Sequence, residues 1–174
     1  EAGGADGLQV DDVPQVVDVG QDEVFLSTRE GMSIRFPEED VRPMGRAATG
    51  VRGIDLEEGD VLVGMDILRP QGTMLAVTAN GYGKRTAVEE YRNQSRGGKG
   101  VITLKVTDKT GPVVGVCQVS EADEVMLVTD GGKILRLAVG EIRMIGRNTQ
   151  GVRLIGLSEN ERLASIARLA EKEE

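Results

Sequence analysis

One pattern of about 50 residues occurs three times along this chain. Each copy begins with an apolar run that ends at a glycine-containing turn, at residues 24–31, 74–81 and 125–132. Each copy closes with the pair Gly-Val, at Gly50-Val51, Gly100-Val101 and Gly151-Val152. Repeats of this length are typical of proteins in which every unit buries its apolar face against its neighbours. The chain is therefore predicted to fold as an array of similar units that share their cores.

Each unit is predicted to contain four β-strands. The first two form a hairpin, because β-rich runs surround Glu-Gly, Asn-Gly or Gly-Gly. The second strands are expected at residues 33–36, 84–87 and 134–137, the third at 51–56, 101–106 and 152–157, and the fourth at 61–68, 113–119 and 163–169. Four strands in a unit of this size are typical of a propeller blade. The predicted fold class is all-β, a propeller-like repeat of about three four-stranded blades.

The last part of the chain offers two interpretations. Residues 158–161 resemble a helix capping box, and residues 162–174 are rich in Ala, Leu, Glu and Lys, which favours a helix. Residues 163–169, however, fall where the other two units place their fourth strand. We therefore predict a strand at 163–169 and a frayed tail at 170–174.

The same register divides the chain into blades at residues 22–71, 72–122 and 123–169, all within one repeat domain. Residues 9–19 resemble 113–119, and both segments lie just before an Asp-Glu-Val sequence. Residues 1–21 are therefore predicted to be the end of a preceding blade or a linker. Three blades and a fraction cannot close a ring, so the chain is predicted to be part of a larger repeat domain.

Composition excludes several classes of function. The sequence has no histidine and one cysteine, Cys117, which excludes an intramolecular disulfide, a Cys/His zinc site and histidine general-base catalysis. Cys117 is predicted to be a reduced, half-buried strand residue. The sequence offers no apolar stretch that could cross a bilayer and no signal peptide at its start, which predicts a cytoplasmic protein without a membrane partner. Aromatic residues make up 2% of the chain, so the core is expected to be aliphatic.

The net charge of −8 argues against a nucleic-acid partner, but the charge is unevenly distributed. Residues 1–68 carry a net charge of −11, residues 69–110 carry +5, and residues 111–174 carry −2. A local basic patch, not the average, decides whether a polyanion binds. The middle repeat is therefore the part most suited to such a partner.

The most specific local signal lies in the segment 92–100 of the middle repeat. Its adjacent glycines let a rigid surface approach the backbone, and its arginine and lysine side chains supply cationic donors for phosphate oxygens. From the residues alone, a phosphate-binding loop and a solvated glycine-rich turn are equally supported. Residues 80–85 hint at a P-loop but lack its glycine spacing and its Ser/Thr after the lysine, so nucleotide binding is rejected there.

Charged residues also recur at equivalent places after each turn. They are a first arginine (Arg35, Arg85, Arg136), an acid (Asp40, Glu90, Glu141), a second arginine (Arg42, Arg92, Arg143) and a third (Arg46, Arg96, Arg147). For the acids, structural contacts between blades are the favoured interpretation. The third arginines precede Gly-Val and are the better candidates for a shared role facing a polyanion. Tyr82, in a hairpin turn, is interpreted as a packing residue.

The sequence resembles the family of DNA gyrase A C-terminal domains over nearly its whole length. The resemblance is clearest in residues 41–54, 80–91 and 145–152. The segment from Gln94 to Gly100 is similar to the family heptad Gln-Arg-Arg-Gly-Gly-Lys-Gly, with Ser95 in place of the first arginine. The resemblance implies the last three of six blades of a β-pinwheel, in which neighbouring blades exchange strands. The heptad lies in the first blade of the family, so this copy is interpreted as a secondary version.

The resemblance also implies a function. The domain would bind and bend duplex DNA around its rim without base-specific contacts, in support of ATP-dependent negative supercoiling by a type IIA topoisomerase. Its partners would be duplex DNA, the rest of gyrase A and the gyrase B protein, in a heterotetramer with two copies of each protein in the bacterial cytoplasm, associated with the nucleoid. ATP and Mg would serve the holoenzyme, with no cofactor, metal or catalytic residue in this chain. Acidic patches elsewhere would keep DNA on the rim.

The residues and the resemblance together predict a DNA-binding site. The strongest contact candidates are Lys84, Arg85, Arg92, Arg96 and Lys99, and the corresponding Arg42, Arg46, Arg143 and Arg147 come second. The predicted site also includes Gln94, Gly97, Gly98 and Gly100 of the same loop. Two alternatives stay open. One is the equivalent C-terminal domain of topoisomerase IV, although the Gly-Gly-Lys-Gly sequence favours gyrase. The other is a propeller that binds only protein, although such repeats normally carry tryptophan, which this chain lacks.

Overall fold

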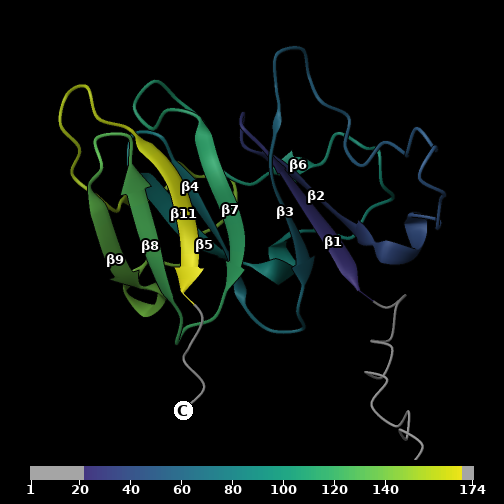
Figure 1. Cartoon of the computed structure of the whole chain (residues 1–174). Helices are drawn as coiled ribbons and strands as arrows, with labels where there is room; N and C mark the ends of the chain where they lie inside the picture. The colour runs from purple at the N-terminus through teal and green to yellow at the C-terminus, as the bar shows by residue number, and fades with distance from the viewer. Residues whose placement is uncertain (1–21, 170–174) are drawn as a thin grey trace, which may run out of the picture.

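The computed structural model describes residues 22–169 as three antiparallel β-sheets that stand side by side (Figure 1). The strands are β1 (Glu23–Thr28), β2 (Met32–Pro37), β3 (Leu62–Leu68), β4 (Thr73–Thr78), β5 (Tyr82–Ala87), β6 (Val101–Ile102), β7 (Val113–Val119), β8 (Glu124–Thr129), β9 (Ile134–Ala138), β10 (Val152–Arg153) and β11 (Leu163–Leu169). Single-turn 3-10 helices follow three of them: η1 (Glu38–Asp40), η2 (Val88–Glu90) and η3 (Val139–Glu141). The all-β fold class is confirmed. The strand and tail expected at residues 1–21 and 170–174 lie outside the described residues.

The third strand of each unit is shorter than the sequence predicts. Of the expected strands at residues 101–106 and 152–157, only Val101–Ile102 and Val152–Arg153 are strands, and residues 51–56 form none. The physical reason is that the chain turns inward after two residues. Leu104 and Ile155 are buried at 1% and 6% exposure, and the N–H groups of Thr103 and Leu104 converge on the carbonyl of Gly31 instead of continuing a ladder.

Each short third strand belongs to the sheet of the preceding repeat. The sheet orders are β3-β1-β2-β6 and β10-β5-β4-β7, with a three-stranded sheet β11-β8-β9. The exchange explains the repeated Gly-Val pair. Gly100 has a φ of 77°, and a Cβ there would lie 2.2 Å from the carbonyl oxygen of Ser33, so only glycine allows β6 to reach β2. Neighbouring repeats are therefore connected by backbone pairing as well as by side chains.

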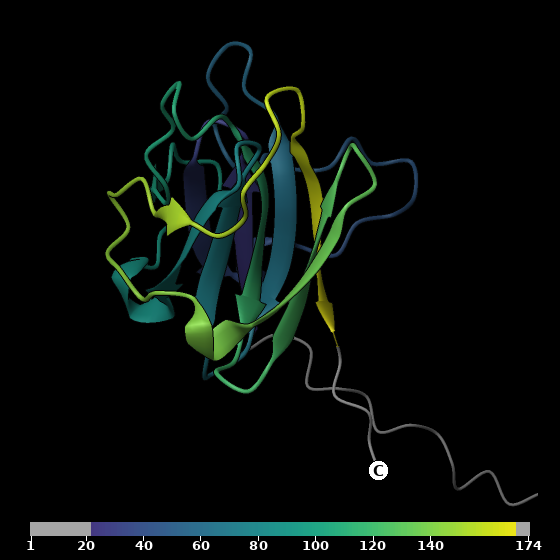
Figure 2. The same cartoon turned by 90° about the vertical axis from the view of Figure 1, so that its left-hand side faces the viewer.

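The fourth strands β3, β7 and β11 form the inner side of the array. Gly64 of β3 lies against Val116 of β7, and Gly115 of β7 lies against Ile166 of β11. In the turned view, β11 and β10 lie on opposite sides of the molecule, so the exchanged third strands face outward (Figure 2). The strand predicted at residues 163–169 is confirmed as β11, and the helical interpretation of this segment is wrong.

Two of the three hydrophobic clusters are shared between neighbouring repeats. One joins Phe25 of β1 to Tyr91 and Leu104 of the second repeat, with the two aromatic rings edge to face at 5.0 Å. Another joins Leu75 of β4 to Leu127 and Ile142 of the third repeat. Most of the clustered side chains are aliphatic, as composition predicts. A repeat separated from its neighbours would expose these surfaces to water.

Cys117 is a free thiol, half-buried on β7 as expected, and burial raises its pKa to about 12, with a further contribution from the nearby Asp66 carboxylate. The thiol is therefore protonated and unreactive at neutral pH. Among residues 22–169, no helix has the length and apolar character needed to span a membrane.

Candidate nucleic-acid interface

The loops that precede the exchanged strands lie at the outer edge of the array. Residues 92–100 lead into β6, the last strand of the first sheet, and residues 143–151 lead into β10, the last strand of the second. Both loops are seated on the preceding repeat: the N–H of Gln94 donates to Arg35 at 2.9 Å, and the N–H of Ile145 donates to Arg85 at 2.9 Å. The repeat thus presents the same loop twice, one blade apart.

The glycine pair of the first loop lies against residues of the preceding repeat. The N–H of Gly97 donates to the carbonyl of Gly53 at 2.6 Å, and Gly98 accepts from the N–H of Asp55 at 2.9 Å. Gly97 needs glycine because its φ is 78°. A Cβ on Gly98 would have only ordinary contacts, the nearest at 3.6 Å, so the fold itself does not require this glycine. The Gln94 side chain lies beside the pair, and its buried amide nitrogen has no hydrogen-bond partner among residues 22–169.

Arg96 and Arg147 occupy equivalent positions and make equivalent contacts. The guanidinium of Arg96 donates to the carbonyls of Asp40 and Arg52, and that of Arg147 donates to the carbonyl of Ile102. Both residues are half-buried at the outer edge. Their remaining N–H donors stay available, but part of each side chain holds the preceding repeat in place.

The repeated acids act between blades. A carboxylate oxygen of Asp40 accepts the backbone N–H of Arg96 at 3.2 Å, and one of Glu90 accepts that of Arg147 at 3.1 Å. The contact joins the 3-10 helix of one repeat to the loop of the next. This placement agrees with the structural role that was favoured for the acids.

The second arginines are exposed in all three repeats. Arg42, Arg92 and Arg143 are all exposed, and none of them makes a side-chain hydrogen bond or ion pair with another described residue. Arg42 and Arg46 lie in the segment 41–50, which is exposed throughout. The counterpart segments of the other two repeats rest on a preceding blade, and the structure describes none before residue 22. Arg92 and Arg143 are therefore the exposed arginines that lie at equivalent outer positions of two successive repeats.

Lys84 is placed differently from the expectation, because its side chain is fully buried. Its Nζ donates to the carbonyl of Gly146 at 2.6 Å, to the carbonyl of Arg147 and to Oγ1 of Thr149 at 3.0 Å. Burial lowers the pKa of Lys84 to about 8, opposed by the Glu90 carboxylate. Lys84 is therefore corrected from a phosphate contact to a support beneath the loop that carries Arg147.

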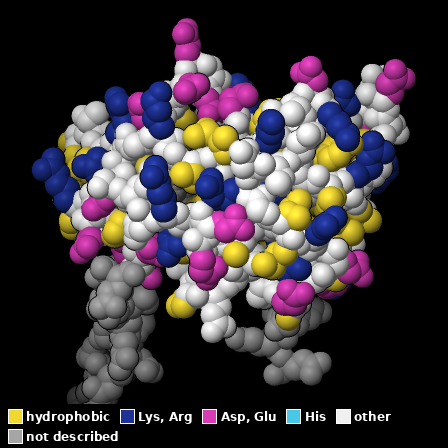
Figure 3. Space-filling view, turned by 180° about the vertical axis from the view of Figure 1, so that it is seen from behind, with side chains coloured by type: hydrophobic (Ala, Val, Ile, Leu, Met, Phe, Trp, Pro, Cys, Tyr) yellow, Lys and Arg dark blue, Asp and Glu magenta, His cyan; other side chains and the backbone are white. Residues whose placement is uncertain are grey.

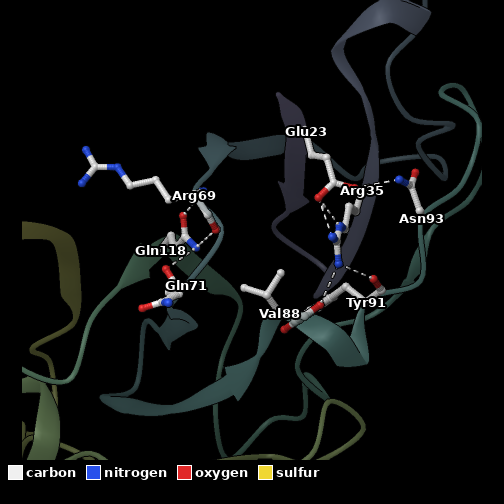
Figure 4. Close-up of polar contacts among 8 residues, drawn as sticks. All are labelled: Glu23, Arg35, Arg69, Gln71, Val88, Tyr91, Asn93 and Gln118. Carbon is white, nitrogen blue, oxygen red and sulfur yellow. Dashed lines mark hydrogen bonds and ion pairs between the residues drawn. The ribbon is translucent and has the colours of Figure 1, made fainter. Parts of the chain in front are cut away.

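Arg85 is also corrected from a DNA contact to a structural residue, because it is 4% exposed. Its Nε donates to the carbonyl of Ile142 at 2.7 Å, and Nη1 pairs with Glu121 at 2.7 Å. Arg35 makes the corresponding contacts one repeat earlier: it binds Glu23 and donates to the carbonyls of Val88 and Tyr91, at 3.2 Å each (Figure 4). Arg35 and Arg85 thus each hold the 3-10 helix segment of the following repeat in place.

A second clamp joins the inner strand β7 to the linker between β3 and β4 (Figure 4). Oε1 of Gln118 accepts the N–H of Arg69 at 2.7 Å, and Nε2 donates to the carbonyls of Arg69 and Gln71 at 2.9 and 3.2 Å. The guanidinium of Arg69 points away from this network. The linker between blades is thereby fixed without using the charge of Arg69.

Basic and acidic side chains are unevenly distributed over the outer face. Seen from behind, Lys and Arg side chains cross the middle of the face, and most Asp and Glu side chains lie towards its upper and lower margins (Figure 3). Lys99 is 73% exposed and faces Glu57 at 3.8 Å, and Arg52 pairs with Asp55 at 3.1 Å. An acidic turn, Glu57–Asp60, therefore adjoins the Gly97–Lys99 loop.

Sequence reasoning missed two exposed cations that the structure places near Tyr82, Lys109 and Arg153. The available signal was the shared sequence Gly-Val-Arg at residues 50–52 and 151–153. Among residues 22–169, no group of three or more Cys, Asp or Glu residues could hold a metal ion.

Comparisons with known proteins agree on one family. A family model described as the DNA gyrase C-terminal domain, a beta-propeller, matches residues 22–69, 73–119 and 123–170. The DNA gyrase A protein of Escherichia coli K12 is 51% identical over 152 residues, which cover 87% of this chain and 17% of that protein. The Staphylococcus aureus NCTC 8325 protein of the same name is 45% identical over 157 residues, covering 89% and 18%. The chain thus spans less than a fifth of the length of these relatives.

Solved structures of the same kind superpose on the chain. The structure of a DNA gyrase A C-terminal domain matches with a TM-score of 0.81 and 32% identity, covering 86% of this chain and 51% of that one. The crystal structure of a topoisomerase IV C-terminal domain also gives a TM-score of 0.81, with 28% identity, covering 86% and 47%. The shape alone therefore does not distinguish gyrase from topoisomerase IV.

Proposed function

The chain belongs to the family of DNA gyrase C-terminal domains, and we propose that its outer edge binds duplex DNA without sequence preference and bends it. The observation that carries the proposal is the pair of exposed arginines, Arg92 and Arg143, which recur one blade apart beside the half-buried Arg96 and Arg147. Lys99 adds a further exposed cation on the glycine loop. Cations at equivalent outer positions of successive blades can follow a duplex backbone around a convex edge.

Phosphate contacts of this kind can offset the free-energy cost of bending the duplex. Bending 20–30 base pairs costs of order 1–6 kcal/mol, which has to be offset by phosphate contacts and counterion release. The glycine loop offers the exposed ammonium group of Lys99, which suits contact with phosphates and does not select a base. Binding of this kind depends strongly on salt and weakly on sequence.

Within the longer protein, we propose that this domain supports ATP-dependent negative supercoiling by gyrase. The partners would be the rest of gyrase A and the gyrase B protein, with ATP and Mg used by the holoenzyme and not by this chain. The curated relatives are bacterial, and the cytoplasm is the compartment in which such a protein meets DNA.

The double variant Arg92→Gln/Lys99→Gln tests the proposed edge. It is expected to bind duplexes of unrelated sequence about 60-fold more weakly at about 0.1 M salt, with a salt slope smaller by about 1.8, because two phosphate contacts are lost. Fluorescence anisotropy of labelled duplexes at several chloride concentrations measures both quantities. The matched control is Arg69→Gln/Arg168→Gln, which removes two exposed cations beside the inner strands. Equal effects of the two double variants would refute an outer-edge site.

The acidic turn beside this loop is expected to weaken binding. Glu57→Gln/Glu58→Gln should tighten duplex binding about 2- to 5-fold at low salt, because Lys99 is released from Glu57 and repulsion of phosphates falls. The gain should disappear at high salt, where exposed charges are screened. In a Lys99→Gln background the same change should have a smaller effect. A gain of the same size in both backgrounds would show that the turn does not act through Lys99.

A further inference from the structure

A groove of about 290 Å³ lies beside Tyr82, between the turns of the second and third repeats. Three exposed cations line it: Lys109, Arg153 and Arg162. Arg153 belongs to β10, the outermost strand of the second sheet, and pairs with Tyr82 of β5. The groove is therefore continuous with the outer edge but lies at the turn end of the strands.

The Tyr82 ring brings two of these cations together. Nζ of Lys109 lies 5.4 Å and Cζ of Arg153 lies 5.6 Å from the ring centre, and Nη2 of Arg153 donates to the hydroxyl at 3.2 Å. The hydrogen bond from Arg153 lowers the pKa of Tyr82 and the charge of Lys109 contributes, against the opposing effect of burial. The ring itself is buried at 7% exposure and so gives the two cations a fixed base.

The one acid among the described lining residues, Glu161, is already engaged in hydrogen bonds within the chain. Glu161 accepts hydrogen bonds from Nζ of Lys133, Oγ1 of Thr129 and the N–H of Ser158, which lower its pKa to about 2. Within residues 22–169, neither Lys109 nor Arg153 forms an ion pair. Two neighbouring positive charges without a counterion indicate a place for an anionic ligand.

The groove beside the turn of the first repeat has the opposite charge. It has a volume of about 350 Å³ beside Met32, which pairs with Ile102 as Tyr82 pairs with Arg153. Five acids and one lysine line it: Glu30, Asp55, Glu57, Glu58, Asp60 and Lys99. The equivalent turn positions of Met32 and Tyr82 thus lie beside acids in the first repeat and beside cations in the second.

We propose that the groove beside Tyr82 is a phosphate-binding site for the backbone of duplex DNA, with Lys109 and Arg153 as its donors. The site rests on the proposed function and extends it beyond the loops at the outer edge. A duplex is drawn toward the turn end of the strands at this groove and repelled from the acid-lined turn of the first repeat. The difference between repeats therefore sets the path of the DNA across the array.

The double variant Lys109→Gln/Arg153→Gln tests this site, with duplexes of two unrelated sequences as the probe. Affinity at about 0.1 M chloride is expected to fall about 60-fold and the salt slope to fall by about 1.8. The charge-matched control Arg69→Gln/Arg168→Gln should bind as the unchanged chain does. Lys109→Gln alone, on an exposed turn outside any strand, should lower affinity about 8-fold and the slope by about 0.9. Thermal unfolding of each variant monitors the fold.

The outcomes separate this site from the proposed function. If Arg92→Gln/Lys99→Gln weakens binding while Lys109→Gln and the double variant keep the original affinity and slope, the groove is not a phosphate site and the outer edge stands. If the unchanged chain fails to bind duplex DNA at low salt, the proposed function is overturned, and this inference with it. A loss of affinity with an unchanged salt slope would also overturn the inference, because it contradicts a phosphate contact.

Discussion

Replacing Gly100 by alanine is expected to lower the free energy of unfolding by more than about 3 kcal/mol. The backbone at Gly100 has a φ of 77°, and this left-handed conformation costs an alanine about 1–2 kcal/mol. The added Cβ would also lie 2.2 Å from the carbonyl oxygen of Ser33, so β6 would have to separate from β2. Gly151→Ala should behave in the same way, since its Cβ would lie 2.6 Å from the carbonyl oxygen of Gly83. Denaturant unfolding of the 174-residue chain measures the loss.

Gly50→Ala is the matched control, because it separates backbone strain from the close approach. Gly50 has a φ of 87° in the same Gly-Val pair, but a Cβ there would meet nothing within 4 Å. Its replacement should therefore cost only the backbone contribution of about 1–2 kcal/mol. If all three variants lost the same free energy of unfolding, strand exchange would not be what the glycine is needed for.

These glycines mark what the sequence could and could not predict about the fold. The period of the repeat was enough to place the hairpins and to identify β11 as a strand, although residues 158–174 locally resemble a helix. The position of Gly-Val was visible, but its partner was not, because the carbonyl of Ser33 belongs to a different repeat. The length of the third strand was overestimated for a similar reason, since Leu104 and Ile155 turn into cores that neighbouring repeats build.

For the candidate site too, the sequence could not predict features that depend on residues far away along the chain. Exposed positions such as Arg92 and Arg143 could be recognised from their spacing alone, because nothing else in the described chain engages their side chains. Lys84 and Arg85 lie in one of the stretches that resemble the family, yet they are buried. Their burial depends on carbonyl groups about 60 residues away, at Gly146, Arg147 and Ile142. A charge pattern cannot show which cations meet such acceptors.

Lys84→Met is expected to lower the free energy of unfolding at pH 7 by about 1–3 kcal/mol. The change removes the ammonium group that donates to the oxygens of Gly146, Arg147 and Thr149, so each of these oxygens loses a charged hydrogen-bond donor. The variant should still fold, because the equivalent position of the first repeat holds the fully buried Ile34. Lys99→Met is the matched control: this lysine is 73% exposed, so stability should stay within about 0.5 kcal/mol of the original.

The pH dependence of this difference tests whether Lys84 carries a buried charge. Burial lowers the pKa of Lys84 from 10.5 to about 8, so between these values the unfolded chain binds more protons than the folded chain. The free energy of unfolding therefore rises with pH, and Lys84 contributes about 2 kcal/mol of this rise between pH 7 and 9.5. Lys84→Met lacks that contribution, so the gap between the two proteins should widen by about 2 kcal/mol over the same interval. Parallel stability curves would mean that the folded protein does not lower the pKa of Lys84, whereas a gap that narrows with pH would mean that the loop oxygens raise it.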